Sequence, residues 1–203
     1  YLAFKFLGVE QHQKIGAKQQ RVFDNGLSRD KDWKQYLFGA GLSVAKTRYG
    51  DCQICNDKGI DLSRHVCLPE FAIRGSFDDI VKNPLRGDEE VVEIKTIHEL
   101  AWKGLKKPLP QHVMQVYPYM AGRNKQSALF VYENKNTQEA KVFRTQFELK
   151  VWNIITARLQ LIVKAIENDW MPDRTPAFNE KGCPFFWVCP VADIKKLKHE
   201  AEI

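Results

Sequence analysis

One strand with charges on a single face constrains the fold of this chain more than any other segment. Residues 90–96, Glu-Val-Val-Glu-Ile-Lys-Thr, have the period of two of a β-strand. That period places Val92 and Ile94 on one face and Glu93 and Lys95 on the other. Paired charges on an otherwise apolar strand need a reason, although the same spacing is also common on exposed hairpins.

A second strand is predicted directly before the first, over residues 77–82. The residues between them, 83–88, read Asn-Pro-Leu-Arg-Gly-Asp and are rich in turn formers. The two strands are therefore expected to pair as a hairpin, which would bring Asp78 close to Glu93.

Two neighbouring carboxylates such as Asp78 and Glu93 resist ionising together unless a cation lies between them. Carboxylate oxygens suit a hard divalent cation, so Mg²⁺ or Mn²⁺ is the expected cofactor. Such an ion can polarise a phosphoryl oxygen and lower the pKa of a bound water, while Lys95 could orient that water or offset developing charge. The chemistry indicated is hydrolysis of a phosphodiester bond.

A helix is predicted over residues 108–119. Gln115 and Tyr119 are four residues apart and share one face, and His112 joins that face three residues before Gln115. Pro118 would remove a hydrogen bond within the helix and is expected to kink it. The opposite, apolar stripe is expected to pack on the sheet and consists of Val113, Val116 and Met120.

With these residues in view, the chain resembles the PD-(D/E)xK nuclease superfamily, and within it the RecB-like exonucleases that include CRISPR-associated and phage-encoded members. Three ordered motifs carry the resemblance: Gly75-x-x-Asp78, then Glu93-x-Lys95, then Gln115-x-x-x-Tyr119. The resemblance implies that Asp78, Glu93 and the Ile94 carbonyl hold the metal and that Lys95 is the catalytic lysine. It further implies that Gln115 and Tyr119 position DNA.

Two more residues are candidates for contact with DNA. His112 matches a histidine often found three residues before the motif glutamine in this family, and it could contact a phosphate. Lys135 lies at the expected tip between two later strands and could also touch DNA. For both residues an ordinary structural or solvated role is the alternative.

The first helix departs from the family pattern. Residues 21–33 resemble that helix, but Asp30 and Lys31 stand where relatives usually carry a histidine and a glutamate. Asp30 could replace the histidine as a metal ligand, because an oxygen donor suits Mg²⁺ or Mn²⁺ at least as well as imidazole does. A simply solvated Asp30 is the other interpretation.

The five cysteines leave three interpretations open. Cys183 and Cys189 resemble the last two ligands of the iron-sulfur cluster that many relatives hold, but Glu180 stands where a third cysteine would be expected. Cys52 and Cys55 form a metal-like pair that Cys67 could join as a small zinc site. Reduced, unrelated thiols are the third interpretation.

The order of the predicted elements indicates one α/β domain over residues 1–203. Helices to about residue 45 are followed by a cysteine-containing excursion at 50–67, three strands, a helix, strands at 127–133 and 139–145, a helix at 149–168, and a C-terminal cysteine segment at 180–190. This order is that of the restriction-endonuclease-like fold, a mixed β-sheet flanked by helices.

Composition indicates the setting of the protein. Hydrophobic residues make up 44% of the chain and charged residues 28%, and no apolar stretch is long enough for a membrane span. Without a recognisable secretory segment, and with an odd number of cysteines, the chain is expected to be intracellular and cytoplasmic, in a bacterial, archaeal or virus-infected cell. The net charge of +6 fits a polyanionic partner such as DNA.

These observations predict a metal-dependent DNA exonuclease that acts from free ends, with single strands as the expected substrate, in recombination, repair or CRISPR-type processing with other proteins. One alternative is a structure-specific or restriction-type endonuclease, which would share the Asp78, Glu93 and Lys95 core. The other is a DNA-binding adaptor that keeps the fold and has lost catalysis.

Overall fold

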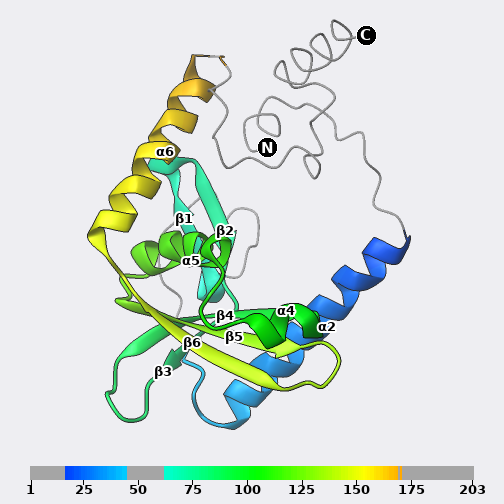
Figure 1. Ribbon diagram of the computed structural model, residues 1–203. Coiled ribbons are helices and arrows are strands. Elements are labelled where there is room, and N and C mark those ends of the chain that lie inside the picture. Colours follow the sequence, from blue (N-terminus) through cyan, green and yellow to red (C-terminus); the bar gives the residue numbers. More distant parts are fainter. Residues whose placement is uncertain (1–16, 45–61, 169, 171–203) are drawn as a thin grey trace, which may run out of the picture.

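A four-stranded sheet in the order β3-β4-β5-β6 organises the structure (Figure 1). The computed structural model describes residues 17–44, 62–168 and 170. Neighbours β4 and β5 are parallel, whereas the outer pairs β3-β4 and β5-β6 are antiparallel. The predicted mixed sheet is therefore confirmed, and its strands are β3 (Asp79–Lys82), β4 (Glu89–Ile97), β5 (Ser127–Asn134) and β6 (Ala140–Gln146).

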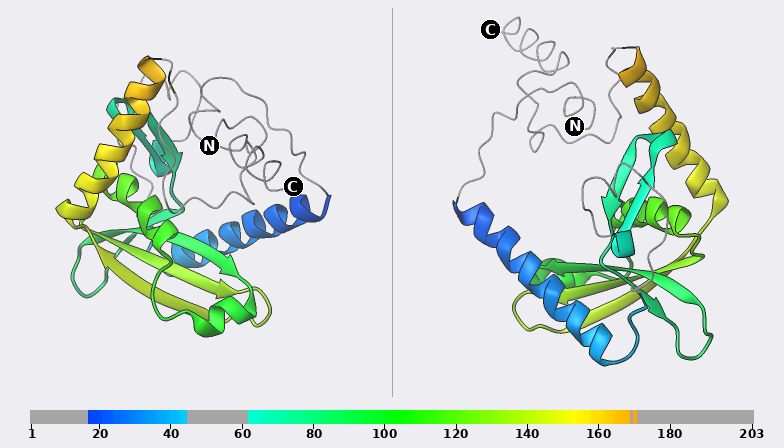
Figure 2. Two further views of the ribbon diagram at one scale, coloured as in Figure 1. Left: turned by 45° about the horizontal axis from the view of Figure 1, so that its top comes forward. Right: turned by 180° about the vertical axis from the view of Figure 1, so that it is seen from behind.

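Helices cover both faces of this sheet (Figure 2). One face packs against α2 (Ala17–Gly39) through an apolar cluster that includes Val92 and Ile94. The other face packs against α5 (Pro110–Gly122), whose Val116 and Met120 are fully buried. The period of two in β4 thus produces two packed faces, and the helix-flanked α/β fold is confirmed. The remaining helices are α4 (Glu99–Gly104) and α6 (Leu149–Glu167).

A second, smaller sheet lies on the α5 side of the molecule and was not predicted from the sequence. Strands β1 (His65–Leu68) and β2 (Ile73–Ser76) pair in antiparallel fashion. They are preceded by the 3₁₀ turn η1 (Leu62–Arg64) and joined by η2 (Pro69–Phe71), after which Ala72 adopts a left-handed conformation with φ of 51°. The prediction of three strands before the helix was therefore wrong, since four strands precede α4 in the described residues. Strands β1 and β2 have four residues each and, unlike β3, neither is followed by a turn and a long alternating strand, so their periodicity is too short to be recognised.

The predicted hairpin around residues 83–88 is confirmed, with a later start for its first strand. Asn83 Oδ1 accepts hydrogen bonds from the backbone N–H groups of Leu85 and Arg86, at 3.0 and 3.1 Å. Gly87, with φ of +77°, lets the chain turn back into β4. The pairing Asp79↔Val92 sets the register, so Asp78 lies just before β3 rather than inside a strand that begins at residue 77.

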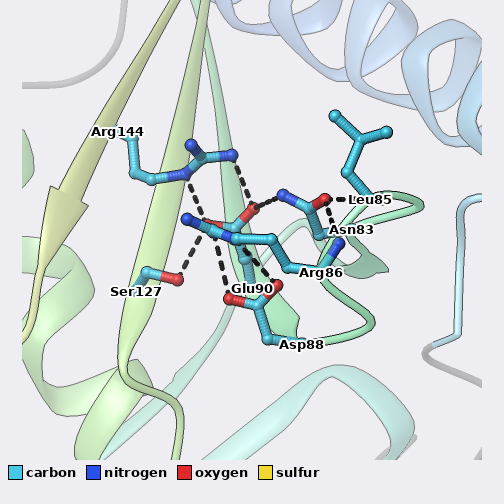
Figure 3. Close-up of polar contacts among 7 residues, drawn as sticks. All are labelled: Asn83, Leu85, Arg86, Asp88, Glu90, Ser127 and Arg144. Atoms are coloured by element: carbon cyan, nitrogen blue, oxygen red, sulfur yellow. Dashed lines mark hydrogen bonds and ion pairs between the residues drawn. The ribbon is translucent and has the colours of Figure 1, made fainter.

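A fully buried carboxylate, that of Glu90, ties the hairpin to the far strands (Figure 3). It accepts hydrogen bonds from Arg144 Nε at 2.6 Å, from Ser127 Oγ at 2.7 Å and from Arg86 at 3.3 Å. Burial opposes ionisation of this carboxyl, but the hydrogen bonds from Arg144 and Ser127 outweigh it and lower the pKa of Glu90. The network is a structural anchor that joins β4, β5 and β6.

The later predicted elements match the structure closely. The strands expected at 127–133 and 139–145 correspond to β5 and β6, and the helix expected at 149–168 to α6. Across the part of the chain that the structure describes, none of the helices has the length and apolarity needed to cross a lipid bilayer. Both ends of the chain fall outside the described residues, as does most of the cysteine-containing excursion.

Candidate active site

Asp78 and Glu93 lie side by side where β3 begins against β4. The backbone N–H of Ile94 donates a hydrogen bond of 2.6 Å to Asp78 Oδ2, which fixes the carboxylate against β4. The Glu93 side chain is 2% exposed, and Asp78 is half-buried. The hairpin register follows from the turn at 83–88, so local sequence alone suffices to bring these two acids together.

Both carboxyl groups are harder to ionise than in water. Burial raises the pKa of Asp78 to about 7, and the negative charges of Glu93 and Asp30 add to the rise, while the Ile94 N–H opposes it. Burial also raises the pKa of Glu93, against the opposing charge of Lys95. A positive charge between the two carboxylates would remove the repulsion. Two neighbouring carboxylates that need a cation are what the sequence predicts.

Lys95 lies two residues beyond Glu93 on the same face of β4. Its ammonium group forms an ion pair with Glu93 Oε1. The Lys95 side chain keeps 26% of its surface exposed, so it is anchored by Glu93 and still reaches solvent. A lysine held in this way can donate to an anionic oxygen near the carboxylates.

Three polar residues on one face of α5 line up along the site. Gln115 lies near both the Glu93 carboxyl and the Tyr119 hydroxyl, and in each case its polar side chain partly offsets a raised pKa. His112 lies one turn earlier, where burial and then the nearby positive charge of Lys95 lower its pKa. The predicted shared face is confirmed, and α5 continues as a helix through Pro118.

Tyr119 depends on the absence of a side chain at Gly75. A Cβ atom on Gly75 would lie 3.3 Å from Tyr119 Cε1 and 3.4 Å from its hydroxyl oxygen. The Tyr119 ring also packs against Phe77, with ring centroids 5.9 Å apart. Glycine at this position therefore lets the tyrosine lie against β2, next to the strand end that presents Asp78.

Asp30 approaches the same site from α2, on the other side of the sheet edge. Its Oδ2 is 2.5 Å from Lys34 Nζ, an ion pair that the spacing of four residues permits. Its Oδ1 is buried and has no hydrogen-bond partner among the described residues. A buried carboxylate oxygen without a donor is an unsatisfied ligand position, and its charge also contributes to the raised pKa values of Asp78 and Glu93. Lys34 was not singled out from the sequence.

The donor set fits a magnesium-type ion better than a zinc-type ion. Within the described residues, no three side chains of His, Cys, Asp or Glu are close enough together to enclose a metal ion. Mg²⁺ is usually held by one or two carboxylates, with water and substrate phosphates completing its octahedron, whereas structural zinc requires four protein ligands. Asp78 and Glu93, with raised pKa values and the unsatisfied oxygen of Asp30 nearby, meet the first requirement.

The two further DNA-contact candidates occupy different places. His112 is partly buried, and its Nδ1 is 2.7 Å from the hydroxyl of Tyr132, a residue that no local pattern marks. Lys135 lies on the α2 side of the sheet, in a groove of about 240 Å³ that also contains Arg29 and Thr96. Lys135 is thus separate from the α5 face.

The cysteine predictions cannot be compared with the structure, because four of the residues lie outside the described part of the chain: Cys52, Cys55, Cys183 and Cys189. The iron-sulfur and zinc interpretations therefore stay predictions.

Comparison with known proteins identifies the fold. No family model and no curated protein matches the sequence. Two solved structures of the alkaline exonuclease LHK-Exo from Laribacter hongkongensis do match. The complex of LHK-Exo with dAMP aligns with a TM-score of 0.53 at 19% identity, over 83% of this chain and 77% of that chain. The other LHK-Exo structure aligns with a TM-score of 0.52 at 16% identity, over 82% of this chain and 87% of that chain. The chain has the fold of an exonuclease.

A third similar structure, that of SSO0001, aligns with 24% identity and a TM-score of 0.41 over 59% of this chain. The chain spans 52% of the length of SSO0001. At 19% and 16% identity the two LHK-Exo structures establish the fold alone, so the chemistry must be inferred from the residues at the hairpin.

Proposed function

We propose that the protein is a metal-dependent deoxyribonuclease that hydrolyses phosphodiester bonds from free DNA ends, with single strands as its preferred substrate. The observation that carries the proposal is the pair Asp78 and Glu93, packed together with raised pKa values beside Lys95. The exonuclease fold supports it, because in LHK-Exo the same fold belongs to a nuclease. The polar face of α5 beside the pair supports it further.

Asp78, Glu93 and the Ile94 carbonyl would hold Mg²⁺ or Mn²⁺, and Asp30 would contribute its oxygen through a water on the ion, because the three carboxylates are not close enough together to bind it directly. A bound ion of this kind polarises a phosphoryl oxygen and lowers the pKa of a coordinated water. The Ile94 N–H holds Asp78 in place for that role. Metal binding requires Asp78 and Glu93 to be ionised, and the bound ion would in turn stabilise their negative charges.

Lys95 would offset the negative charge that develops on the phosphoryl oxygens. Its ion pair with Glu93 keeps the ammonium group at the site before substrate arrives. Gln115 and Tyr119 would position the DNA strand along α5 by hydrogen bonding and ring contact. His112 would add a contact to a phosphate at the N-terminal end of this row.

The test is degradation of linear, end-labelled single-stranded DNA with Mg²⁺, with Mn²⁺ and with a chelator. The wild-type protein should release label only when metal is present, and Glu93→Gln and Lys95→Ala should be inactive while remaining folded by circular dichroism. A matched control is Lys103→Ala, which removes an exposed lysine from the nearby helix α4 and should leave cleavage unchanged. Full activity of Glu93→Gln and Lys95→Ala would place the site elsewhere.

Circular substrates separate the alternatives. An exonuclease leaves covalently closed single-stranded circles intact and degrades the same DNA once it is linearised. Cleavage of the circles would indicate an endonuclease instead. A protein that binds DNA without metal, cleaves none of it, and keeps its DNA affinity in Glu93→Gln would be the DNA-binding adaptor instead.

A further inference from the structure

Tyr132 lies beneath the polar face of α5 and contacts the first residue of that face, His112. The tyrosine is completely buried in β5. Its hydroxyl oxygen is 2.7 Å from His112 Nδ1, and the two rings are stacked with centroids 5.6 Å apart and planes 28° apart. Tyr132 also pairs with Lys95 in the β4-β5 register, so it places the imidazole beside the lysine of the site.

The hydrogen bonds of the Tyr132 hydroxyl determine where its proton points. The oxygen accepts a hydrogen bond of 3.0 Å from the backbone N–H of Leu109, the N-cap residue directly before α5. A hydroxyl has one proton to donate. Within the described structure, His112 Nδ1 is the only acceptor in reach of that proton. The geometry therefore makes Tyr132 the donor and His112 Nδ1 the acceptor.

An accepting Nδ1 fixes the tautomer of the imidazole. The ring proton must then be on Nε2, and the ring is neutral. In the reverse arrangement, with Nδ1–H donating, the buried hydroxyl proton of Tyr132 would have no acceptor, which is costly for a group shielded from water. Burial and the positive charge of Lys95 also lower the pKa of His112 to about 4, in agreement with a neutral ring.

The remaining nitrogen of His112 is available to a ligand. His112 Nε2 makes no hydrogen bond to any described residue, and it is not among the buried polar atoms that lack a partner. It belongs to a half-buried side chain on the same face of α5 as Gln115 and Tyr119. A neutral N–H donor here can bind a phosphate oxygen without adding a second cation next to Lys95.

We propose that Tyr132 is a positioning residue that holds His112 as the neutral Nε2–H tautomer, so that His112 donates a hydrogen bond to a phosphodiester oxygen of the substrate. The tautomer follows from the structure alone. The phosphate contact rests on the proposed nuclease function, so the two parts are tested separately.

The tautomer is measured by ¹⁵N NMR of protein labelled at histidine, near neutral pH, with the His112 signals assigned from their loss in His112→Ala. The wild-type protein should show a protonated Nε2 and an unprotonated Nδ1. Tyr132→Phe keeps the stacked ring and should convert His112 into a mixture of tautomers. A protonated Nδ1 in the wild-type protein, or His112 signals that Tyr132→Phe leaves unchanged, would overturn the assignment.

The matched control for folding is Tyr117→Phe. Tyr117 is another buried tyrosine, whose hydroxyl donates to the Gln146 carbonyl at 3.2 Å and accepts from the Glu148 N–H at 3.3 Å. Its substitution removes the same number of hydrogen bonds without involving a histidine, so it should lower stability and leave the His112 signals in place. An equal effect of both variants on the His112 signals would mean that the change is a general loosening and would overturn the proposal.

The phosphate contact is measured through KM for linear DNA. His112→Ala should raise KM by about tenfold, the loss expected for a hydrogen bond to a charged group. His112→Gln, which keeps a neutral N–H donor near the Nε2 position, should recover much of this loss. Tyr132→Phe should raise KM by up to about twofold, because only a fraction of the molecules then has the competent tautomer. That effect should vanish when His112→Gln is already present.

The outcomes separate the two proposals. If the wild-type protein does not cleave DNA, the proposed function fails and the NMR result still decides the tautomer. If the protein cleaves DNA and Tyr132→Phe raises KM equally with and without His112→Gln, the link through the histidine is wrong.

Discussion

Glu90 and Glu93 are three residues apart on β4, are both almost completely buried, and have pKa values shifted in opposite directions. Burial opposes ionisation of both. Glu90 is surrounded by Arg144, Ser127 and Arg86, whereas Glu93 has Lys95 and faces two further carboxylates. One glutamate is thus a satisfied structural anion, and the other is an anion that lacks sufficient positive charge.

This contrast predicts opposite effects of the same substitution on stability. Glu90→Gln should lower the free energy of unfolding by about 2 kcal/mol, less than the full cost of breaking a buried pair because the arginines reach solvent. Glu93→Gln should leave the metal-free protein as stable as the wild type or slightly more stable, since it removes repulsion with Asp78. Urea unfolding in the presence of a chelator checks both. A larger loss for Glu93→Gln than for Glu90→Gln would contradict this assignment of the two glutamates.

The raised pKa of Asp78 predicts an unusual pH dependence in the metal-free protein. The group has an ordinary pKa of 3.8 and a folded pKa of about 7, so between these values the folded state binds a proton that the unfolded state has released. The free energy of unfolding contributed by this group therefore falls as pH rises from about 4 to about 7. Asp78→Asn should flatten the fall, measured by chemical denaturation with chelator across this range. An equally steep fall in Asp78→Asn would assign the dependence to other groups.

A bound divalent metal ion should offset the loss of stability that ionisation of Asp78 causes. Adding Mg²⁺ or Mn²⁺ at about 100 times its dissociation constant should stabilise the wild-type protein by about 2.7 kcal/mol. The variants Asp78→Asn and Glu93→Gln should show little or no stabilisation at the same concentration. Thermal unfolding near pH 8 measures the shift, and Ca²⁺ serves as a comparison because it prefers more ligands and longer bonds. Equal stabilisation of the wild type and both variants would place metal binding elsewhere.

Gly75 tests the position of Tyr119. Gly75→Ala introduces a Cβ about 3.3 Å from the tyrosine ring, so the ring must shift by a few tenths of an ångström. Cleavage should fall by about tenfold, since a displacement of about 1 Å can cost about a hundredfold. Gly104→Ala is the control, because a Cβ there has no neighbour within 4 Å. The measurement is the steady-state rate of DNA cleavage by both variants. Unchanged activity of Gly75→Ala would mean that the position of Tyr119 does not matter for cleavage.

Local sequence patterns were sufficient for the strand that carries Glu93 and Lys95, for the hairpin that brings Asp78 to it, and for the helix that carries Gln115 and Tyr119. Each depends on residues close together in the chain, where a period of two, a period of 3.6 or a cluster of turn formers is visible. The mixed sheet and its flanking helices followed from the order of those elements.

Contacts between distant residues were decided by the tertiary structure alone. The short β1-β2 sheet, the burial of Glu90 by Arg144, the approach of Asp30 from α2 and the contact between Tyr132 and His112 have no local signature. Each joins side chains through the pairing of strands or through packing across a sheet face, and such pairings have no periodicity in the sequence. The sequence by itself determined which residue types form the site, whereas folding decided which charges are paired and which are left for a ligand.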